Sequence, residues 1–161
     1  AYDRIVDITK ETIEEYRSVA HALTPPSLKE NSLSEALNVM ISTLHNSSKI
    51  NFIFIDTDHD LNLSDTVKIE LFRITQELIN NALKYSKADT IIIKFKFEDD
   101  IFSLSVKDNG IGFDTKSISK KGSGIGIGNV YARANFINGK FSLKSSIGQG
   151  TTGQVKIKKT C

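Results

Sequence analysis

The sequence predicts an α+β fold in which a mixed, mainly antiparallel sheet is covered by helices on one face. Two observations support this fold class. Some segments place apolar residues at helical spacing, and others alternate apolar with polar residues in short runs rich in Val, Ile and Phe. Their order along the chain is helix–helix–strand–helix–strand–strand–loop–helix–strand–strand. The content of 39% hydrophobic and 25% charged residues is ordinary for a globular domain.

Residues 1–24 form the first predicted helix, and the Pro-Pro pair that follows ends it. Val6, Ile13 and Ala20 recur every seven residues, a heptad spacing typical of a helix packed on a partner helix. A plain amphipathic helix packed on its own domain explains the pattern equally well. Because the chain begins inside this helical pattern, we expect a fragment of a longer protein.

The second helix and the first strand come next. Ser32 is a natural N-cap, and Glu35 stands three residues later, as in a capping box before the apolar run 33–44. Residues 50–57 are rich in Ile and Phe and predict a strand.

The longest predicted helix begins at Ser64-Asp65 and extends to about Tyr85. Two strands, 91–97 and 102–106, follow it as a hairpin whose turn is Glu98-Asp99-Asp100.

The last third of the chain begins with a segment, 108–128, that is rich in glycine and lysine and has no apolar period. A helix is predicted from Asn129 to Ile137, closed by a left-handed cap at Asn138-Gly139. Two final strands, 141–145 and 153–158, flank Gly148-Gln149-Gly150.

A polar stripe on the long helix is the first candidate for chemistry. Glu77, Asn81 and Lys84 are spaced i, i+4 and i+7, so they share one face, and Asn80 borders it. A solvated helix face has the same pattern, so the stripe alone does not decide the function.

Two glycine-rich segments are the second candidate. Asp108-Asn109-Gly110-Ile111-Gly112-Phe113 directly follows a strand, where it forms either a simple turn or a carboxylate presented to a ligand amine. Gly122 to Gly128 precedes a helix, and such glycines expose backbone N–H groups to an anion. A Rossmann dinucleotide-binding fingerprint would need a strand immediately before its glycines, and no strand is predicted there. A Walker phosphate-binding motif is also absent from the sequence.

These segments together resemble the ATP-binding boxes of the GHKL superfamily, which includes gyrase, heat-shock chaperone, histidine kinase and mismatch-repair ATPases. Gln76 to Ser86 resembles the N box, and Asp108 to Phe113 and Gly122 to Gly128 resemble the two glycine boxes. Gly148 to Thr152 resembles the closing G-x-G-T-x element. The resemblance implies a Bergerat-type two-layer sandwich preceded by the coiled-coil-like helix.

The N-terminal segment narrows the resemblance to one class of sensor histidine kinases, which includes nitrate and lipid-fluidity sensors. Residues 17–28 are similar to the end of that class's second dimerisation helix, and 34–37 continue the pattern. We therefore expect two parts: residues 1–28 as the end of that helix with a linker, and 29–161 as the ATP-binding catalytic domain.

The resemblance implies ATP and Mg²⁺ as cofactors. Asp108 would accept a hydrogen bond from the adenine amino group, Gly110 and Gly112 would shape the adenine wall, and Thr151 or Thr152 would assist from the last strand.

On the phosphate side, the resemblance implies that Asn81 binds Mg²⁺, with Asn80 as a further polar group, and that Lys84 contacts phosphate. The resemblance also implies that Glu77 would be the catalytic acid and would help to position the metal or the attacking histidine. Residues 114–126 would form the ATP lid, and the N–H groups of the second glycine box would face the phosphates. The predicted phosphate-binding glycines are Gly122, Gly124, Gly126 and Gly128. Many relatives have a basic residue where this chain has Gly128, so phosphate affinity is expected to be weaker.

Two other patterns are rejected. His21 is followed by Ala22, where a phosphoacceptor histidine is followed by an acid, so we place the acceptor outside this chain. The acidic run 56–62 lacks the Gly and Glu that a calcium loop needs, because Leu61 and Val67 occupy those positions.

The expected function is thus the catalytic half of a two-component sensor kinase. A response regulator would be the partner, the N-terminal helix would form a homodimer in the full-length protein, and nucleic acid would not be bound. The fragment alone would not phosphorylate itself. Its single cysteine, Cys161, favours a cytoplasmic setting, with a parent that is free or membrane-anchored. The alternatives are another GHKL ATPase, an anti-sigma-type serine kinase, and a nucleotide-dependent docking module.

Overall fold

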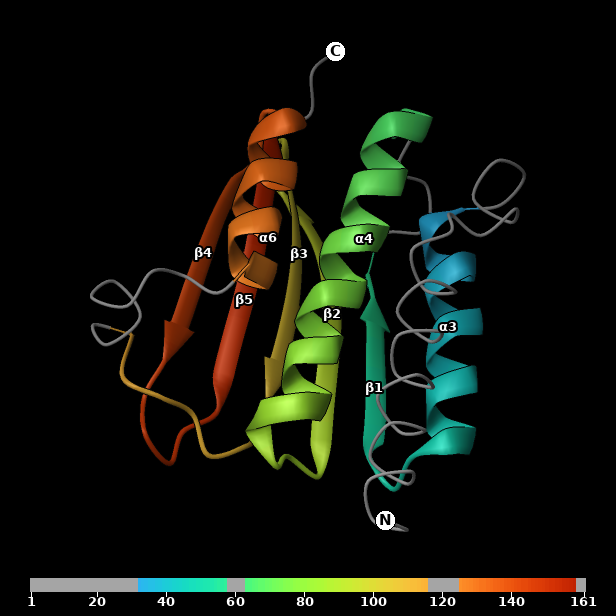
Figure 1. The fold of residues 1–161 in the computed structure, drawn as a ribbon. Coiled ribbons are helices and arrows are strands. Elements are labelled where there is room, and N and C mark those ends of the chain that lie inside the picture. The colour runs from blue at the N-terminus through green and yellow to red at the C-terminus, as the bar shows by residue number, and fades with distance from the viewer. Residues whose placement is uncertain (1–31, 58–62, 116–124, 159–161) are drawn as a thin grey trace, which may run out of the picture.

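A computed structural model describes residues 32–57, 63–115 and 125–158 (Figure 1). The predicted helix 1–24, the domain segment 1–28, His21, Gly122 and Gly124 lie outside these residues. The elements are, in chain order, α3 (Leu33–Ser47), β1 (Asn51–Asp56), α4 (Asp65–Asn81), the π-helical turn η1 (Ala82–Ser86), β2 (Thr90–Glu98), β3 (Ile101–Asp108), α6 (Ile125–Phe136), β4 (Lys140–Ser145) and β5 (Thr151–Lys158).

The five strands form one sheet in the order β1-β2-β3-β5-β4. β1 pairs with β2 in parallel, and the other three pairings are antiparallel. Figure 1 shows α3, α4 and α6 packed on the same face of this sheet, with α4 between the other two. The predicted mixed, mainly antiparallel sheet with helices on one face is confirmed.

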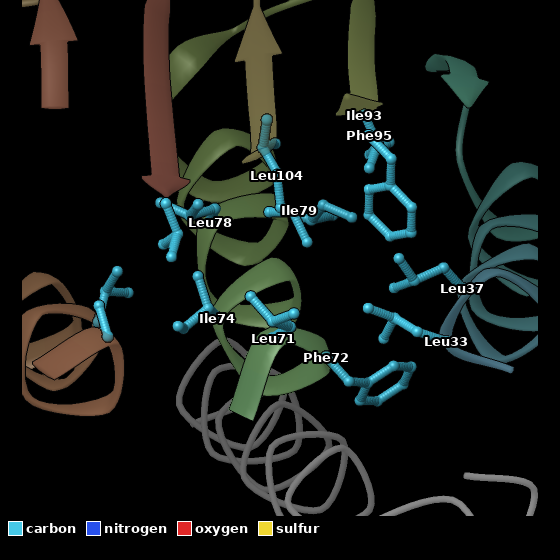
Figure 2. Packing of buried hydrophobic residues seen from close by; sticks show 14 of the residues in the cluster. Leu33, Leu37, Leu71, Phe72, Ile74, Leu78, Ile79, Ile93, Phe95 and Leu104 are labelled. Carbon is cyan, nitrogen blue, oxygen red and sulfur yellow. The ribbon is translucent and has the colours of Figure 1, made fainter. Parts of the chain in front are cut away.

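The core lies between the helices and the sheet because alternate strand residues point toward the helical layer. On β2 and β3 these are Ile91, Ile93 and Phe95 opposite Asp108, Val106 and Leu104, all of them buried. Leu71, Ile74 and Leu78 of α4 belong to the same hydrophobic cluster, and Figure 2 shows them along α4, with Leu33 and Leu37 of α3 to one side of that helix. The apolar residues of the helices and the inward-facing residues of the strands therefore form one hydrophobic cluster.

Local sequence signals explain several element ends. Ser32 caps α3 with the predicted capping box, because its hydroxyl accepts from the Glu35 N–H (3.2 Å) and the Glu35 carboxylate accepts from the Ser32 N–H (2.8 Å). Asp99 and Asp100 both have positive φ, the backbone of a tight two-residue hairpin turn. Asn138, at φ 54°, provides the predicted left-handed end after α6.

Three boundaries differ from the sequence-based expectation. The long helix changes after Asn81 into a π-helical turn that ends at Ser86. α6 begins at Ile125 rather than Asn129, so Gly126 and Gly128 lie within its first turns. β5 begins at Thr151, two residues earlier than expected, because Thr151 pairs with both Asp108 of β3 and Ser145 of β4.

None of the helices formed by the described residues combines the length and the apolar character that a membrane crossing requires.

Candidate functional site

A cavity of about 670 Å³ lies between the helical layer and one end of the sheet. It is bounded by the end of α4, η1, the segment after β3, the start of α6, and the facing ends of β4 and β5. This volume is in the range of small-molecule and cofactor sites. The residues that line it are Glu77, Leu78, Asn80, Asn81, Ala82, Lys84, Tyr85, Ser86, Val106, Asp108, Ile111, Gly112, Phe113, Gly126, Ile127, Asn129, Leu143, Thr151 and Gly153.

Asp108 is the most deeply placed acidic group of the cavity, with a residue exposure of 5%. Its Oδ1 accepts a hydrogen bond from the Gly110 N–H (2.8 Å), and the structure gives Oδ2 no partner among the described residues. No fully buried side-chain oxygen or nitrogen in the described part lacks a partner, so Oδ2 is reachable from the cavity. A nearly buried acceptor open to a cavity can bind a ligand donor strongly.

The glycine segment after β3 is held against the π-helical turn. Ser86 accepts from the Ile111 N–H through its backbone oxygen (2.7 Å), and a Cβ at Gly110 would lie 2.6 Å from the Ser86 Cβ. The Ser86 hydroxyl in turn donates to the backbone oxygen of Ala82 (2.7 Å). π-Helical turns often occur at functional sites. Here the turn brings Ser86 under the loop that carries Asp108.

Ser145 joins three parts of the cavity wall from the end of β4. Its hydroxyl accepts from the Phe113 N–H (2.9 Å), donates to the backbone oxygen of Gly150 (2.9 Å), and contacts the Thr151 hydroxyl (3.0 Å). Gly150 has φ 72°, and a Cβ there would lie 2.9 Å from the backbone carbon of Asp108, so only glycine fits without strain.

Asn109 secures the start of the same segment to β2. Its Oδ1 accepts from the N–H groups of Asp89 (3.2 Å) and Thr90 (3.1 Å), and its amide donates to the Asp89 carboxylate (2.8 Å). The Thr90 hydroxyl and this Asn109 amide lower the pKa of Asp89 below its ordinary value. The loop after β3 is therefore anchored at both ends.

Glu77 and Asn81 form the polar end of the cavity on α4. The Asn81 amide donates to Glu77 Oε1 over 3.4 Å, a long hydrogen bond. Gly126 of α6 lies so close that a Cβ there would overlap Glu77 Oε1 and lie 3.1 Å from its Cδ. Since the first turn of a helix leaves N–H groups without intrahelical partners, this approach places donors beside the Glu77 carboxylate.

An ion pair holds the two helices together on the side of the core. Arg133 Nη1 of α6 lies 2.7 Å from Glu70 Oε2 of α4, and both side chains are partly buried. The contact orients α6 relative to the helix that carries Glu77 and Asn81.

The cavity brings together most of the predicted site residues, but not all of them. Gly110 lies beneath the wall as the partner of Asp108, while Gly128 has open space around its Cβ position and does not line the cavity. Thr152 pairs with Lys107 on the opposite face of the sheet, because neighbouring strand residues alternate, so its side chain is not at the cavity. The predicted residues that line the cavity are Glu77, Asn80, Asn81, Lys84, Asp108, Gly112, Gly126 and Thr151.

Sequence reasoning missed three residues that shape the site: Ser86, Ser145 and Gly153. A Cβ at Gly153 would lie 2.7 Å from Leu78 Cδ2, so this glycine lets α4 approach β5. An isolated glycine inside a strand is a recognised signal of such close approach. No local pattern distinguishes Ser145 from other strand serines.

The described residues contain no group of three or more His, Cys, Asp or Glu side chains arranged to hold a metal ion. Glu77 and Asn81 nevertheless provide two oxygen-bearing side chains at one end of the cavity. Mg²⁺ in nucleotide sites takes one or two protein oxygens and fills its remaining positions with phosphate and water. The donor set therefore fits Mg²⁺ delivered with a nucleotide.

Comparison with known proteins gives a consistent result. A family described as histidine kinase-, DNA gyrase B- and HSP90-like ATPases matches residues 66–160. The signal transduction histidine-protein kinase/phosphatase DegS of Bacillus subtilis is 36% identical over 110 residues, which cover 68% of this chain and 29% of that protein. The oxygen sensor histidine kinase NreB of Staphylococcus carnosus is 25% identical over 154 residues, covering 96% of this chain and 44% of that protein.

Among solved structures, the histidine kinase domain of a blue-light activated histidine kinase from Erythrobacter litoralis superposes with a TM-score of 0.67. It is 15% identical, and the match covers 80% of this chain and 61% of that one, which shows a shared fold. The chain spans less than half the length of these two curated relatives. Its residues place it in the family of histidine kinase-, DNA gyrase B- and HSP90-like ATPases, and both of these curated relatives are histidine kinases.

Proposed function

We propose that the cavity binds Mg²⁺-ATP with adenine at Asp108 and phosphates at Glu77, Asn81 and Lys84. Within the whole protein, the γ-phosphoryl group then passes to a histidine outside this chain. The observation that carries the proposal is Asp108, a nearly buried carboxylate with one oxygen open to the cavity.

At the adenine end, Asp108 Oδ2 accepts a hydrogen bond from the exocyclic amino group. Gly112 has φ 60°, and a Cβ there would lie 2.9 Å from the Ser146 backbone carbon, so only glycine lets this part of the wall pack against the loop after β4. Val106 and Leu143 supply apolar surface from the sheet, and Thr151 supplies a hydroxyl. This combination suits a planar base with a single donor to recognise.

At the phosphate end, Lys84 offers an ammonium group and Asn81 an amide oxygen, both on the cavity wall. Gly126 lies in the first turn of α6, where backbone N–H groups and the helix dipole favour anions. Glu77 and Asn81 would hold Mg²⁺ at this end, and the ion would supply positive charge against the charge that develops during transfer. Asn80 is a further polar group on this side.

Phosphoryl transfer requires the acceptor imidazole nitrogen in line with the bond between the γ-phosphorus and the bridging oxygen to ADP. That bond breaks and a phosphorus–nitrogen bond forms, so accurate positioning contributes most of the catalysis. Glu77 lies where its carboxylate can orient the metal or the imidazole. Residues 114–126, most of which lie outside the described part, are proposed as the lid over the phosphates.

The parent protein is proposed to act as a homodimer through the N-terminal helix and to pass the phosphoryl group to an aspartate of a response regulator. Its catalytic part is proposed to work in the cytoplasm. The phosphoacceptor histidine lies outside this chain in this proposal. We therefore expect the 161-residue chain to bind nucleotide without phosphorylating itself.

The thermal midpoint with and without Mg²⁺-ADP tests nucleotide binding directly. A ligand that binds only the folded state stabilises it by about 2.7 kcal/mol when its concentration is a hundredfold above Kd. We expect the midpoint to rise by several degrees with Mg²⁺-ADP and with a non-hydrolysable ATP analogue. An unchanged midpoint at millimolar nucleotide would show that the cavity does not bind nucleotide and would refute the proposal.

Gly126→Ala is expected to weaken the Mg²⁺-dependent part of nucleotide affinity about tenfold, the effect typical of groups that orient metal ligands. The new methyl group would displace the Glu77 carboxylate, which is the flexible end of its side chain, so the fold should tolerate the change. Isothermal titration with ADP, in Mg²⁺ and in EDTA, measures the effect.

Gly128→Ala is the matched control because it makes the same change in the same helix, where a Cβ meets nothing within 4 Å. It keeps the backbone N–H and should stabilise the helix by up to about 1 kcal/mol with unchanged affinity. Equal effects of the two variants on Mg²⁺-dependent binding would show that contact with Glu77 is unimportant.

A further inference from the structure

The face of the sheet that points away from the helices is dominated by exposed lysines. No described helix covers it, and Figure 1 shows α3, α4 and α6 all on the other side. The side chains at alternate positions of β2, β3, β5 and β4 define what we call the lysine face. Its lysines are Lys94, Lys96, Lys107, Lys140, Lys144, Lys156 and Lys158, all exposed.

Strand pairing arranges these side chains in rows across the sheet. One row runs Lys96, Ser103, Lys156 and Lys140 over four adjacent strands. Neighbouring strands lie about 4.8 Å apart, so the lysines of a row span roughly 14 Å. The remaining positions of these rows hold serine, threonine, glutamine, Glu98 and two isoleucines, Ile92 and Ile101. The face lacks aromatic side chains and arginine among its described residues.

The charge on this face is strongly one-sided. Glu98 is the one acidic side chain on it among the described strands, and it pairs with Lys96. Hydrogen bonding and charge attraction from Lys96, and then the charge of Lys156, lower the pKa of Glu98. Seven lysines and one glutamate give the face a formal charge of +6, whereas the whole chain carries +2, so the remainder carries −4. The lysine face is therefore much more positive than the chain as a whole.

Protection of sheet edges does not explain these lysines. Charged residues on edge strands prevent association between sheets, and β4 is an edge strand. Most of the lysines, however, lie on the inner strands β2, β3 and β5. Lys140 and Lys156 also lie directly opposite each other, an arrangement of like charges that destabilises a sheet.

The composition of the lysine face favours one kind of binding partner. Protein interfaces are poor in lysine and serine and depend on aromatic and arginine anchors, which this face lacks. Single-stranded nucleic acids need aromatic platforms for their bases, which are also missing. An array of exposed lysine charges spread over a sheet face suits an extended layer of anionic groups. A bilayer surface containing acidic lipids has that form, and each nearby lysine strengthens binding to it about fivefold.

We propose that the lysine face binds the surface of membranes that contain anionic lipids. Lys107 and Asp108 are consecutive and point to opposite faces of β3, so the nucleotide cavity would face away from the bilayer. Membrane contact and nucleotide binding therefore use separate surfaces. This binding is independent of the proposed chemistry, since no residue of the lysine face lines the cavity.

Vesicle flotation tests the proposal with two lipid mixtures, phosphatidylcholine alone and phosphatidylcholine with phosphatidylglycerol. We expect the chain to float only with the anionic vesicles and to be released by high salt. The double variant Lys107→Gln/Lys156→Gln should bind them about 25-fold more weakly, the product of two fivefold losses. Because it removes the repulsion between Lys156 and Lys140, its thermal midpoint should not fall.

The matched control is Lys49→Gln/Lys87→Gln, which removes the same charge from exposed sites outside the lysine face. It should retain wild-type binding within a few-fold, and both variants should keep the wild-type thermal shift with Mg²⁺-ADP. Equal weakening by both variants, or no flotation of the wild type with anionic vesicles, would overturn the proposal. Preferential binding to double-stranded DNA over vesicles, lost with Lys107 and Lys156, would assign the face to nucleic acid and also overturn it.

Discussion

Asp108→Asn is expected to weaken ADP binding about 100-fold and to leave the fold intact. Asparagine has the shape of aspartate, and its Oδ1 can still accept from the Gly110 N–H, so the loop after β3 keeps its anchor. At the Oδ2 position, however, an amide donor would face the adenine amino group, which is also a donor. Losing a charged hydrogen bond and leaving a donor unpaired costs about 2–3 kcal/mol, which corresponds to the stated factor.

The base specificity of Asp108→Asn distinguishes a direct contact between Asp108 and the base from a general disturbance of the cavity. Inosine diphosphate has an oxygen where ADP has its amino group, so it should bind the wild type poorly and Asp108→Asn comparatively well. Titration calorimetry with both nucleotides measures this reversal. If Asp108→Asn weakens ADP and inosine diphosphate equally, Asp108 does not contact the base, and the adenine must be placed elsewhere in the cavity.

Phe95→Ala is expected to have the largest effect on stability, about 3–5 kcal/mol, as for other buried Phe to Ala changes. Phe95 lies on a central strand with 2% exposure and makes edge-to-face contacts with Phe54 and Phe102, each with ring centres 5.2 Å apart. Figure 2 shows its ring between α3 and the sheet, near Leu37. Removing it leaves a cavity at the junction of α3, β1 and β3. Urea denaturation, analysed by linear extrapolation, measures the loss.

Phe136→Ala is the control for Phe95 because the same atoms are deleted from a side chain with 68% exposure at the end of α6. Its stability should change by less than about 0.5 kcal/mol. Comparable losses in both variants would mean that the core is not centred on the junction of α3 with the sheet. A loss of 3–5 kcal/mol is a large share of the 5–15 kcal/mol typical of a domain.

Much of the fold could be predicted because its signals are local. The capping box at Ser32, the positive-φ turn at Asp99-Asp100 and the left-handed Asn138 each depend on a few adjacent residues. The apolar alternation of β2 and β3 likewise depends on which side chains recur along one segment. Because these signals do not need distant contacts, the order of the elements from α3 onward is confirmed.

The start of α6 was predicted wrongly because its first residues have low helix propensity. Gly126 and Gly128 favour a loop, and glycine costs about 1 kcal/mol in a helix relative to alanine. Contact with α4 outweighs this cost, through the ion pair of Arg133 with Glu70 and the close approach of Gly126 to Glu77. The π-helical turn similarly depends on the fit of Ser86 beneath Ile111, a contact between residues 25 positions apart.

The sequence by itself determined the element order, the family boxes and the identity of Glu77, Asn81 and Asp108 as candidates, because spacing and residue type carry that information. Only the tertiary structure decided that Thr151 and not Thr152 faces the cavity, since strand register places Thr151 opposite Asp108. It also decided the role of Ser145, whose partners come from a distant loop. Strand register and the cavity walls depend on which remote segments pack together. The free energy of that packing is a property of the assembled core.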